Sequence, residues 1–453
     1  MLIESLSGVR AHDEELTDDF VRAYAVAFSE LVEAKRIVIG RDTRESGERI
    51  VEEMKKALIE QGVKVVDIGI CPTPTLQYNV HYQGAQGGIE VTASHNPLPW
   101  NGLKFIGGDS MFLRPEQVEE LIDKRKQIQE NYPAPQDEEA EVIEEKGIDP
   151  HIESLLMLKY LNKNRVQEQN FTVAFDGVNG AGFEAIPKLL EKIGCEVVTI
   201  NCDAEEDFPR APEPSPEKLT DLEELVQQES ADIGFAVDAD ADRLAIVDDN
   251  GDAISEEMTL ALAEKLILQK VIAYDKQVVT NLSTTRSVDD VAEEFEGAEV
   301  IRTKVGEINV VETLEEVEGV IGGEGNGGVI LPHSHRGRDA MTGVLLILQL
   351  MAETDGSISD ILSDMKQYYM LKQKVDKDDL EMTEDLIEEI KEIGDFEEEN
   401  TADGVRLDFE EGWVHIRPSN TEPIFRIYAE GADEESAKDI IEPYMKFLKD
   451  KQS

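Results

Sequence analysis

The chain has 453 residues, of which 98 are Asp or Glu and 44 are Lys or Arg, so its formal net charge is −54. Such a charge repels nucleic acid and anionic membranes, and we expect neither as a partner. No apolar run reaches the roughly 18 residues of a membrane helix, and we find no signal-peptide pattern at the start. Cys71, Cys195 and Cys202 have neither disulfide-framework nor zinc-site spacing, which favours a cytoplasmic location.

The acidic residues are spread over the whole sequence, including the helix-like stretches 119–130 and 384–399. A solvated acidic surface adapted to high salt explains this distribution better than a specific cationic partner, which remains the alternative. Because salt screens repulsion between like charges, the first explanation predicts that stability depends on salt.

Three stretches share one pattern, in which an apolar run, a polar loop and a helix-period segment precede a second apolar run. They cover residues 36–69, 171–201 and 276–306. Each reads as a strand–helix–strand unit, so we expect largely parallel strands in three related α/β domains.

The end of the chain differs, because residues 404–431 alternate like antiparallel strands and residues 433–450 are helix-like. The expected fold is α/β, with three related mixed-sheet domains and a smaller C-terminal α+β domain around a central cleft. The expected domains are 1–150, 151–254, 255–368 and 369–453. Residues 137–149 read as the linker out of the first domain, and residues 368–379 as the hinge before the last.

Ligand sites in open α/β sheets lie beyond the carboxyl ends of strands, and four loops stand out there. In the first, "TASHNP" follows an apolar run and contains Ser94 and His95, with Lys104 further on. Taken alone, it also fits an ordinary strand-to-helix turn capped by Ser94. It is not a hydrolase elbow, since the flanking glycines of that motif are missing.

The second loop, "DADADR", alternates Asp238, Asp240 and Asp242 and ends at Arg243. Three carboxylates this close repel one another unless a cation lies among them, and hard oxygen ligands suit Mg²⁺ or Ca²⁺. An EF-hand loop is excluded, because its sixth position requires glycine and here is Arg243. A solvated acidic turn is a further alternative, but the apolar flanks argue against it.

The third loop carries groups that can recognise hydroxyls or amines, and the fourth carries groups that suit a phosphate. "GEGNGG" offers Glu324 and Asn326 on a glycine-rich backbone, although a flexible turn explains it equally well alone. "RPSNTEP" clusters Arg417 with hydroxyl and amide groups that suit a phosphate, with a polar hairpin loop as the alternative. That cluster comprises Arg417, Ser419, Asn420 and Thr421.

Cationic residues are scarce, yet many follow strands, which indicates an anionic ligand. They are Arg10, Arg41, Arg44, Lys104, Arg243, Arg302, Lys304, Arg336, Arg338, Arg417 and Arg426.

The four loops, in this order, resemble the α-D-phosphohexomutase superfamily of phosphoglucomutases, phosphomannomutases and phosphoglucosamine mutases. "SGVRA", "GRDTRESG", "FDGVNGAG", "FPRAPEPSPEKL" and "RTKVGE" extend the resemblance over essentially the whole chain. It implies an intramolecular phosphotransferase that interconverts hexose 6-phosphate and hexose 1-phosphate. A hexose 1,6-bisphosphate would serve as intermediate and activator.

The resemblance also implies residue roles. Ser94 would carry the phosphoryl group and, with Asp238, Asp240 and Asp242, hold one Mg²⁺. Catalytic or electrostatic roles would fall to His95, Lys104, Arg10 and Arg243. The substrate would be bound by Glu324, Asn326, Arg417, Ser419, Asn420, Thr421 and Arg426.

One departure bears on sugar specificity. Many bacterial members have serine and histidine where this chain has Asn326 and Gly328, whereas archaeal and some bacterial members resemble this variant. The stretches "LIESLSGVRA" and "TASHNPLPWNGLKF" favour glucosamine 6-phosphate as the substrate. Phosphomannomutase/phosphoglucomutase activity is the close alternative. A metal-dependent phosphatase, or a non-catalytic sugar-phosphate-binding protein, is an alternative of another class, and we expect a monomer or homodimer.

Overall fold

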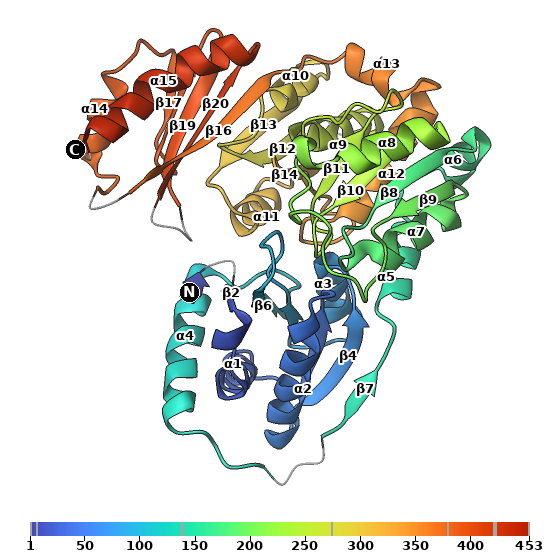
Figure 1. The fold of residues 1–453 in the computed structure, drawn as a ribbon, viewed down its shortest axis with the longest axis vertical. Helices are drawn as coiled ribbons and strands as arrows, with labels where there is room; N and C mark the ends of the chain where they lie inside the picture. The colour runs from blue at the N-terminus through green and yellow to red at the C-terminus, as the bar shows by residue number, and fades with distance from the viewer. Residues whose placement is uncertain are drawn as a thin grey trace.

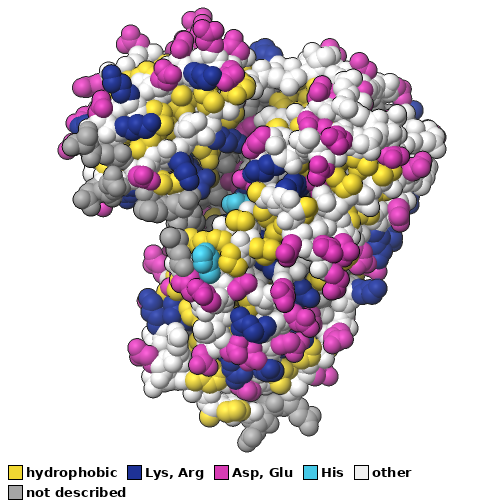
Figure 2. Space-filling view, in the orientation of Figure 1, with side chains coloured by type: hydrophobic (Ala, Val, Ile, Leu, Met, Phe, Trp, Pro, Cys, Tyr) yellow, Lys and Arg dark blue, Asp and Glu magenta, His cyan; other side chains and the backbone are white. Residues whose placement is uncertain are grey.

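The computed structural model describes residues 2–5, 8–136, 140–272, 275–377, 380–419 and 424–451. It has four sheets in four successive parts of the chain (Figure 1). Acidic side chains are scattered over all four parts, and the surface is hollowed where the first part faces the last (Figure 2). None of the described helices combines the length and the apolar character needed to cross a membrane.

The first domain is built on a seven-stranded sheet in the order β1-β2-β6-β5-β3-β4-β7. Its strands are β1 (Ile3–Ser5), β2 (Gly8–His12), β3 (Arg36–Arg41), β4 (Lys64–Ile70), β5 (Gly87–Val91), β6 (Trp100–Gly107) and β7 (Val142–Glu144). Its helices are α1 (Asp18–Leu31), α2 (Glu45–Glu60), α3 (Thr73–Tyr82) and α4 (Pro115–Glu130).

The segment 137–149 is more than the expected linker, because β7 lies within it and pairs in parallel with β4. Val142 is 40% exposed, so this short edge strand has little of the apolar signal that marks buried strands. Helix α5 (Ile148–Leu155) follows at once, so the expected boundary after residue 150 falls inside it.

The second domain contains β8 (Thr172–Asp176), β9 (Glu196–Ile200), β10 (Ile233–Val237), β11 (Leu244–Val247), α5, α6 (Lys163–Gln169), α7 (Gly182–Ile193) and α8 (Thr220–Glu229). The third contains β12 (Lys276–Asn281), β13 (Ala298–Thr303), β14 (Ile321–Glu324), β15 (Gly328–Ile330), α9 (Glu257–Lys270), α10 (Ser287–Glu293), α11 (Glu307–Glu316), α12 (Ala340–Thr354) and α13 (Ile358–Ser363).

The three predicted repeat units are confirmed by sheet topology. The orders β6-β5-β3-β4, β11-β10-β8-β9 and β15-β14-β12-β13 are the same arrangement of four successive strands. In each, the first strand pairs in parallel with the second and third, and the fourth pairs antiparallel with the third. The carboxyl ends of corresponding strands therefore supply corresponding loops.

The fourth domain is an antiparallel sheet in the order β16-β20-β19-β18-β17. Its elements are β16 (Tyr369–Asp376), α14 (Glu384–Lys391), β17 (Glu398–Asn400), β18 (Val405–Phe409), β19 (Gly412–Pro418), β20 (Ile424–Gly431) and α15 (Glu434–Lys451). The predicted α+β character is confirmed. The expected hinge at 368–379 is mostly the strand β16, which pairs with β20 along its whole length. Many of its side chains are exposed and polar, so its sequence does not show the apolar pattern of a buried strand.

Burial separates the fourth domain from the others. One apolar core joins Leu76 of α3, Phe235 of β10 and Leu346 of α12, so the first three domains share a packed interior. The fourth has its own core, with Val414, Phe425 and other residues of the sheet against α15. Because burial of apolar area is the main stabilising term, the first three domains behave as the more firmly joined body.

Candidate active site

The first predicted loop follows β5, and hydrogen bonds from neighbouring side chains hold its backbone in place. Ser94 has φ = 51°, a left-handed conformation that non-glycine residues rarely adopt. The Arg44 guanidinium donates to the carbonyl oxygens of Ser94 and Asn96, both at 2.8 Å, and is itself held by Asp42 at 2.9 Å. Thr92 Oγ1 accepts from the Ser94 amide at 2.9 Å. This network fixes the backbone against its strain.

The three aspartates follow β10 and converge with Ser94. Carboxylate oxygens of Asp238, Asp240 and Asp242 lie within 4.8 Å of one another, and all three residues are buried. Ser94 Oγ donates to Asp238 Oδ2 at 3.2 Å. The second oxygens of Asp240 and Asp242 are buried and have no hydrogen-bond partner among the described residues. Unpaired hard oxygen donors of this kind fit Mg²⁺.

Lys104, on β6, reaches the same carboxylates from the first domain. Its Nζ lies 2.5 Å from Asp240 Oδ2 and 3.4 Å from Asp242 Oδ2. Burial opposes ionisation of Asp240, but the Lys104 ammonium and its hydrogen bond outweigh burial and hold the pKa of Asp240 below its usual range. Burial, followed by the two neighbouring carboxylates, raises the pKa of Asp238 well above its usual value. The cluster therefore favours added positive charge near Asp238.

The three remaining predicted residues surround Ser94. His95 Nδ1 lies 3.3 Å from Ser94 Oγ, and Arg10 donates to Asn96 Oδ1 at 2.8 Å. Arg243 donates to Glu213 at 2.8 Å, and its Nε lies 3.9 Å from Asp238 Oδ2. Burial, with Arg243 and Arg10 nearby, lowers the pKa of His95 well below its usual value. His95 is therefore a neutral imidazole at neutral pH.

The aspartate loop is also fixed by α3, a contact that sequence reasoning missed. Thr73 Oγ1 donates to Asp240 Oδ2 at 2.6 Å, and the Thr73 amide donates to the Asp240 carbonyl at 3.0 Å. Thr73 is the first residue of α3 and directly follows Pro72. The sequence "CPTPT" indicates the start of a helix and contains no sign of a contact with Asp240. Its partner lies far along the chain, so only the folded domains bring the two together.

Glu324 is positioned by an arginine that sequence reasoning placed only among the loop cations. Arg338 donates to Glu324 at 2.6 Å and to Asp242 at 2.8 Å, and its Nε lies 3.0 Å from Glu307. Glu324 Oε1 also accepts from the Asn281 side chain at 2.9 Å. One guanidinium thus joins the aspartate loop of the second domain to the glycine-rich loop of the third.

The glycines of the third loop lie close to neighbouring parts of the protein. A Cβ on Gly327 would lie 2.3 Å from the Leu244 carbonyl oxygen, and one on Gly325 would lie 1.9 Å from the Glu257 carboxylate. Asn326 Oδ1 accepts from the Gly328 amide at 3.1 Å and closes the β14–β15 turn. Close approach of neighbouring protein therefore explains these glycines without a ligand.

The fourth loop presents a row of cations across three strands. Arg417 of β19 pairs directly with Arg426 of β20, which pairs in turn with Lys374 of β16. Like charges directly opposite one another on a sheet destabilise it, so this row is favourable when an anion binds. Ser419 follows β19, whereas the predicted residues Asn420 and Thr421 lie outside the described residues.

The structure thus brings Arg10, Ser94, His95, Lys104, Arg243 and the three aspartates into one cluster, which Arg338 extends to Glu324. Arg417, Ser419 and Arg426 lie on the separate sheet of the fourth domain. In Figure 1 this sheet lies across from the first domain, on the side where Figure 2 shows the hollow.

Comparison with solved structures finds this four-domain fold in another protein. A phosphoglucomutase/phosphomannomutase family protein from Burkholderia thailandensis superposes with a TM-score of 0.84 over 99% of this chain and 97% of that chain, at 24% identity. At that identity the likeness establishes the fold.

The chain belongs to the phosphoglucomutase/phosphomannomutase family. It matches the models for alpha/beta/alpha domains I, II and III at residues 4–132, 149–251 and 255–368, and the C-terminal domain at 370–445. A phosphoglucomutase/phosphomannomutase of Thermococcus kodakarensis is 36% identical over 98% of this chain and 97% of its own length. A probable phosphoglucosamine mutase of Methanopyrus kandleri is 33% identical over the same shares. Members of this family are mutases that transfer phosphate within a sugar.

Proposed function

We propose that the chain is a phosphohexomutase in which Ser94 carries the phosphoryl group between the 1- and 6-positions of a hexose. The observation that carries this proposal is the position of the Ser94 hydroxyl, 3.2 Å from Asp238 in the buried aspartate cluster. The strained backbone of Ser94, held by Arg44, presents this one hydroxyl to the cluster. Such rigid presentation favours a reacting group over an ordinary turn.

Asp238, Asp240 and Asp242, with the Ser94 oxygen, would hold one Mg²⁺. When bound, this ion neutralises charge on the transferring phosphoryl group. A phosphorylated Ser94 carries close to two negative charges beside Asp238, which disfavours the phosphoserine unless positive charge lies nearby. Burial, followed by the charges of Asp240 and Asp242, raises the pKa of Asp238, so the site already disfavours negative charge.

The chain's own cationic side chains would stabilise the phosphoryl group while it is transferred. Arg243 and Arg10 both lie near His95 and would donate to phosphoryl oxygens. Lys104 holds Asp240 and Asp242. His95, neutral and 3.3 Å from the hydroxyl, would orient Ser94. The nearly complete burial of Ser94, at 1% exposure, favours transfer to sugar over transfer to water.

The second phosphate of the substrate would bind the cation row of the fourth domain. Arg417 and Arg426, with Ser419 and the predicted Asn420 and Thr421, supply donors that suit a phosphate. The hexose would lie between this row and Ser94, with Glu324 and Asn326 near its hydroxyls. A hexose 1,6-bisphosphate intermediate would turn around in the hollow and return its other phosphate to Ser94.

Glucosamine 6-phosphate is the proposed preferred substrate. It is supported by the motif resemblance and by relatives named probable phosphoglucosamine mutase at 33–34% identity. Interconversion of glucose or mannose phosphates is the second candidate, favoured by the 36% identical relative named phosphoglucomutase/phosphomannomutase. A panel of glucosamine, N-acetylglucosamine, glucose and mannose phosphates, compared by kcat/KM with the matching bisphosphate present, decides between them.

The reaction itself is tested by Ser94→Ala. We expect loss of nearly all mutase activity with an unchanged far-UV spectrum, and peptide mapping of the wild type after exposure to bisphosphate should find phosphate on Ser94. Ser110→Ala is a matched control, because Ser110 also has a positive φ in a first-domain turn. Removal of Mg²⁺ with EDTA should abolish turnover and its return should restore it. A fully active Ser94→Ala enzyme would overturn the proposal.

A further inference from the structure

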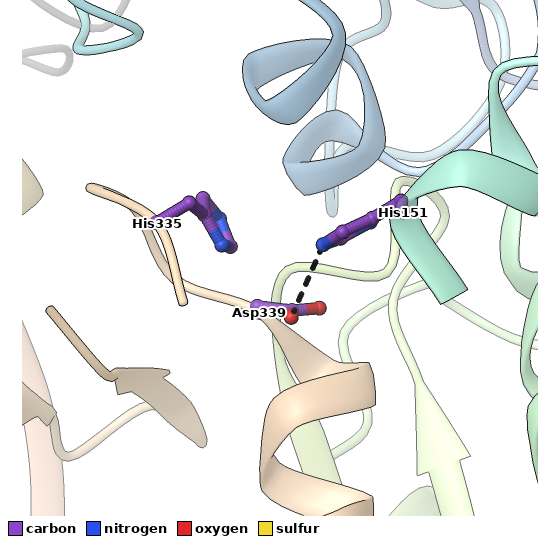
Figure 3. A group of neighbouring side chains, drawn as sticks. All are labelled: His151, His335 and Asp339. Carbon is purple, nitrogen blue, oxygen red and sulfur yellow. Dashed lines mark ion pairs between the residues drawn. The ribbon is translucent and has the colours of Figure 1, made fainter. Parts of the chain in front are cut away.

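A second group of possible metal ligands lies outside the Ser94 cluster, where α5 meets the start of α12 (Figure 3). It consists of His151 on α5, His335 in the loop after β15, and Asp339, the N-cap of α12. All three are buried, and one ligand atom of each lies within 4.8 Å of the others. His151 Nε2 and Asp339 Oδ2 are 3.8 Å apart.

The imidazole nitrogens of this group lack the partners that buried polar atoms normally have. Within the described part of the chain, neither ring nitrogen of His335 has a hydrogen bond, and neither does Nε2 of His151. Among the described residues, His151 is the only ion-pair partner of the Asp339 carboxylate. Buried polar side chains are hydrogen-bonded in the large majority of cases. Within the described ranges, the Asp339 carboxylate accepts only from the start of α12, namely from the Met341 amide and from the amide and hydroxyl of Thr342. Three unpartnered imidazole nitrogens beside this carboxylate therefore call for a ligand.

The surroundings orient these side chains as outer-shell contacts orient metal ligands. His151 Nδ1 lies 3.0 Å from Thr75 Oγ1, which leaves Nε2 directed at Asp339 (Figure 3). The Tyr78 ring stacks on the His151 ring at 4.9 Å. Asp339 accepts from the amides of Met341 at 2.9 Å and Thr342 at 3.1 Å, which fixes its carboxylate.

We propose that His151, His335 and Asp339 bind one divalent transition-metal ion of the Zn²⁺ class. Two imidazoles and one carboxylate are ligands that Zn²⁺, Co²⁺ and Ni²⁺ prefer, whereas Mg²⁺ prefers oxygen alone. Ligand atoms around a tetrahedral Zn²⁺ lie roughly 3.4 Å apart, so the 3.8 Å separation needs only a small contraction. A water would complete the coordination.

The ion would fasten parts of the molecule that form the Ser94 cluster. His151 belongs to α5, whereas His335 and Asp339 precede and begin α12 of the third domain. Asp339 directly follows Arg338, the residue that joins Asp242 to Glu324. Metal binding would therefore stabilise the arrangement of the second and third domains, and it is independent of the sugar that the enzyme uses.

The test is metal uptake by tag-free, chelator-treated enzyme in molar KCl, which screens the acidic surface, and with millimolar Mg²⁺, which fills oxygen sites. We expect Co²⁺ to give the visible absorption bands of a nitrogen-ligated site with one ion per chain. Zn²⁺ should displace it and raise the unfolding temperature. Asp240→Asn should keep the bands, which excludes the aspartate cluster as their source.

His335→Gln and His151→Gln should each weaken Co²⁺ affinity by more than the roughly 10–100-fold effect of an outer-shell change. His333→Ala is the matched control, because His333 lies in the same loop and contacts Lys159 at 2.7 Å, and it should bind like the wild type. Uptake of no ion by the wild type overturns the proposal whether or not the variants fold. If the wild type binds Co²⁺ and both glutamine variants bind it equally well, the proposal is also overturned.

Discussion

Arg338 is the residue whose loss should most disturb the site without touching the reacting serine. Its guanidinium contacts Asp242 at 2.8 Å, Glu307 at 3.0 Å and Glu324 at 2.6 Å. Arg338→Met keeps much of the side chain's volume but removes the charge from between three buried carboxylates. Breaking a buried ion pair costs about 3–5 kcal/mol, because the remaining charge is left uncompensated.

We expect Arg338→Met to lower the free energy of unfolding by about 3–5 kcal/mol. The sum of the energies of the three ion pairs would be larger, but Glu307 reduces the loss of stability because it can become neutral. Burial, against the opposing effect of Arg338, raises the pKa of Glu307 to about 7, so this carboxyl can take up a proton when the arginine is removed. Arg338→Lys keeps the charge but cannot reach all three acceptors, so it should fall between the wild type and Arg338→Met.

The assay is urea unfolding at fixed KCl, followed by tryptophan fluorescence and circular dichroism. Arg336→Met is the matched control, since Arg336 lies in the same loop, has a half-exposed side chain and forms an ion pair with Glu315 at 2.8 Å. It should cost less than about 1 kcal/mol. Adding Glu307→Gln should recover about 0.5–3 kcal/mol of the loss if the two groups interact directly. Equal destabilisation by Arg338→Met and Arg336→Met would refute the reasoning.

Three further predictions concern binding, pH and salt. Arg417→Ala should raise KM roughly 10–150-fold, because loss of a charged hydrogen bond costs about 1.5–3 kcal/mol, and an unchanged KM would contradict a phosphate role. Burial lowers the pKa of His415 to about 3 from its usual 6.5. As the pH falls, His415 is therefore protonated in the unfolded chain before it is protonated in the folded protein. The free energy of unfolding then decreases as the pH drops below 6.5. The free energy of unfolding is lower by about 1.4 kcal/mol at about pH 5.5 than at high pH because of His415. His415→Asn should remove this contribution to the pH dependence of the free energy of unfolding between about pH 6.5 and 5.5. An equal pH dependence in the wild type and the variant would refute the assignment. The Debye length falls from about 30 Å at 0.01 M to about 3 Å at 1 M salt, so the melting temperature should rise with KCl, and a flat curve would favour a cationic partner for the acidic surface.

Much of the architecture could be predicted because its signals are local. Each of the three repeat units carries its own apolar runs, and parallel strands deliver their loops to one edge of a sheet. The convergence of Ser94 with Asp238, Asp240 and Asp242 is implied only by the motif resemblance, because their loops follow strands of two separate sheets. The brevity and exposure of β7 hid it, because a short exposed edge strand needs no apolar pattern.

The contacts that hold the site together could not be predicted. Thr73 is an unremarkable helix-start residue until α3 meets Asp240. Arg338 was one cation among many, and its three partners come from separate parts of the chain. The glycines at 325 and 327 suggested a ligand, whereas their close neighbours are Glu257 and Leu244. Such pairings depend on how domains dock, which no short sequence window contains.

Strand β7 makes the chain between the first two domains a structural part of the first. Cutting the chain before Val142 would leave β4 with an open edge, which can pair with other chains and aggregate. A separately expressed first domain should therefore extend through Glu144. Between β7 and α5 only residues 145–147 remain, and the Gly147 carbonyl is held by Asn79 of α3 at 3.0 Å. This short connection and the shared core of the first three domains together fix the position of the first domain against α5.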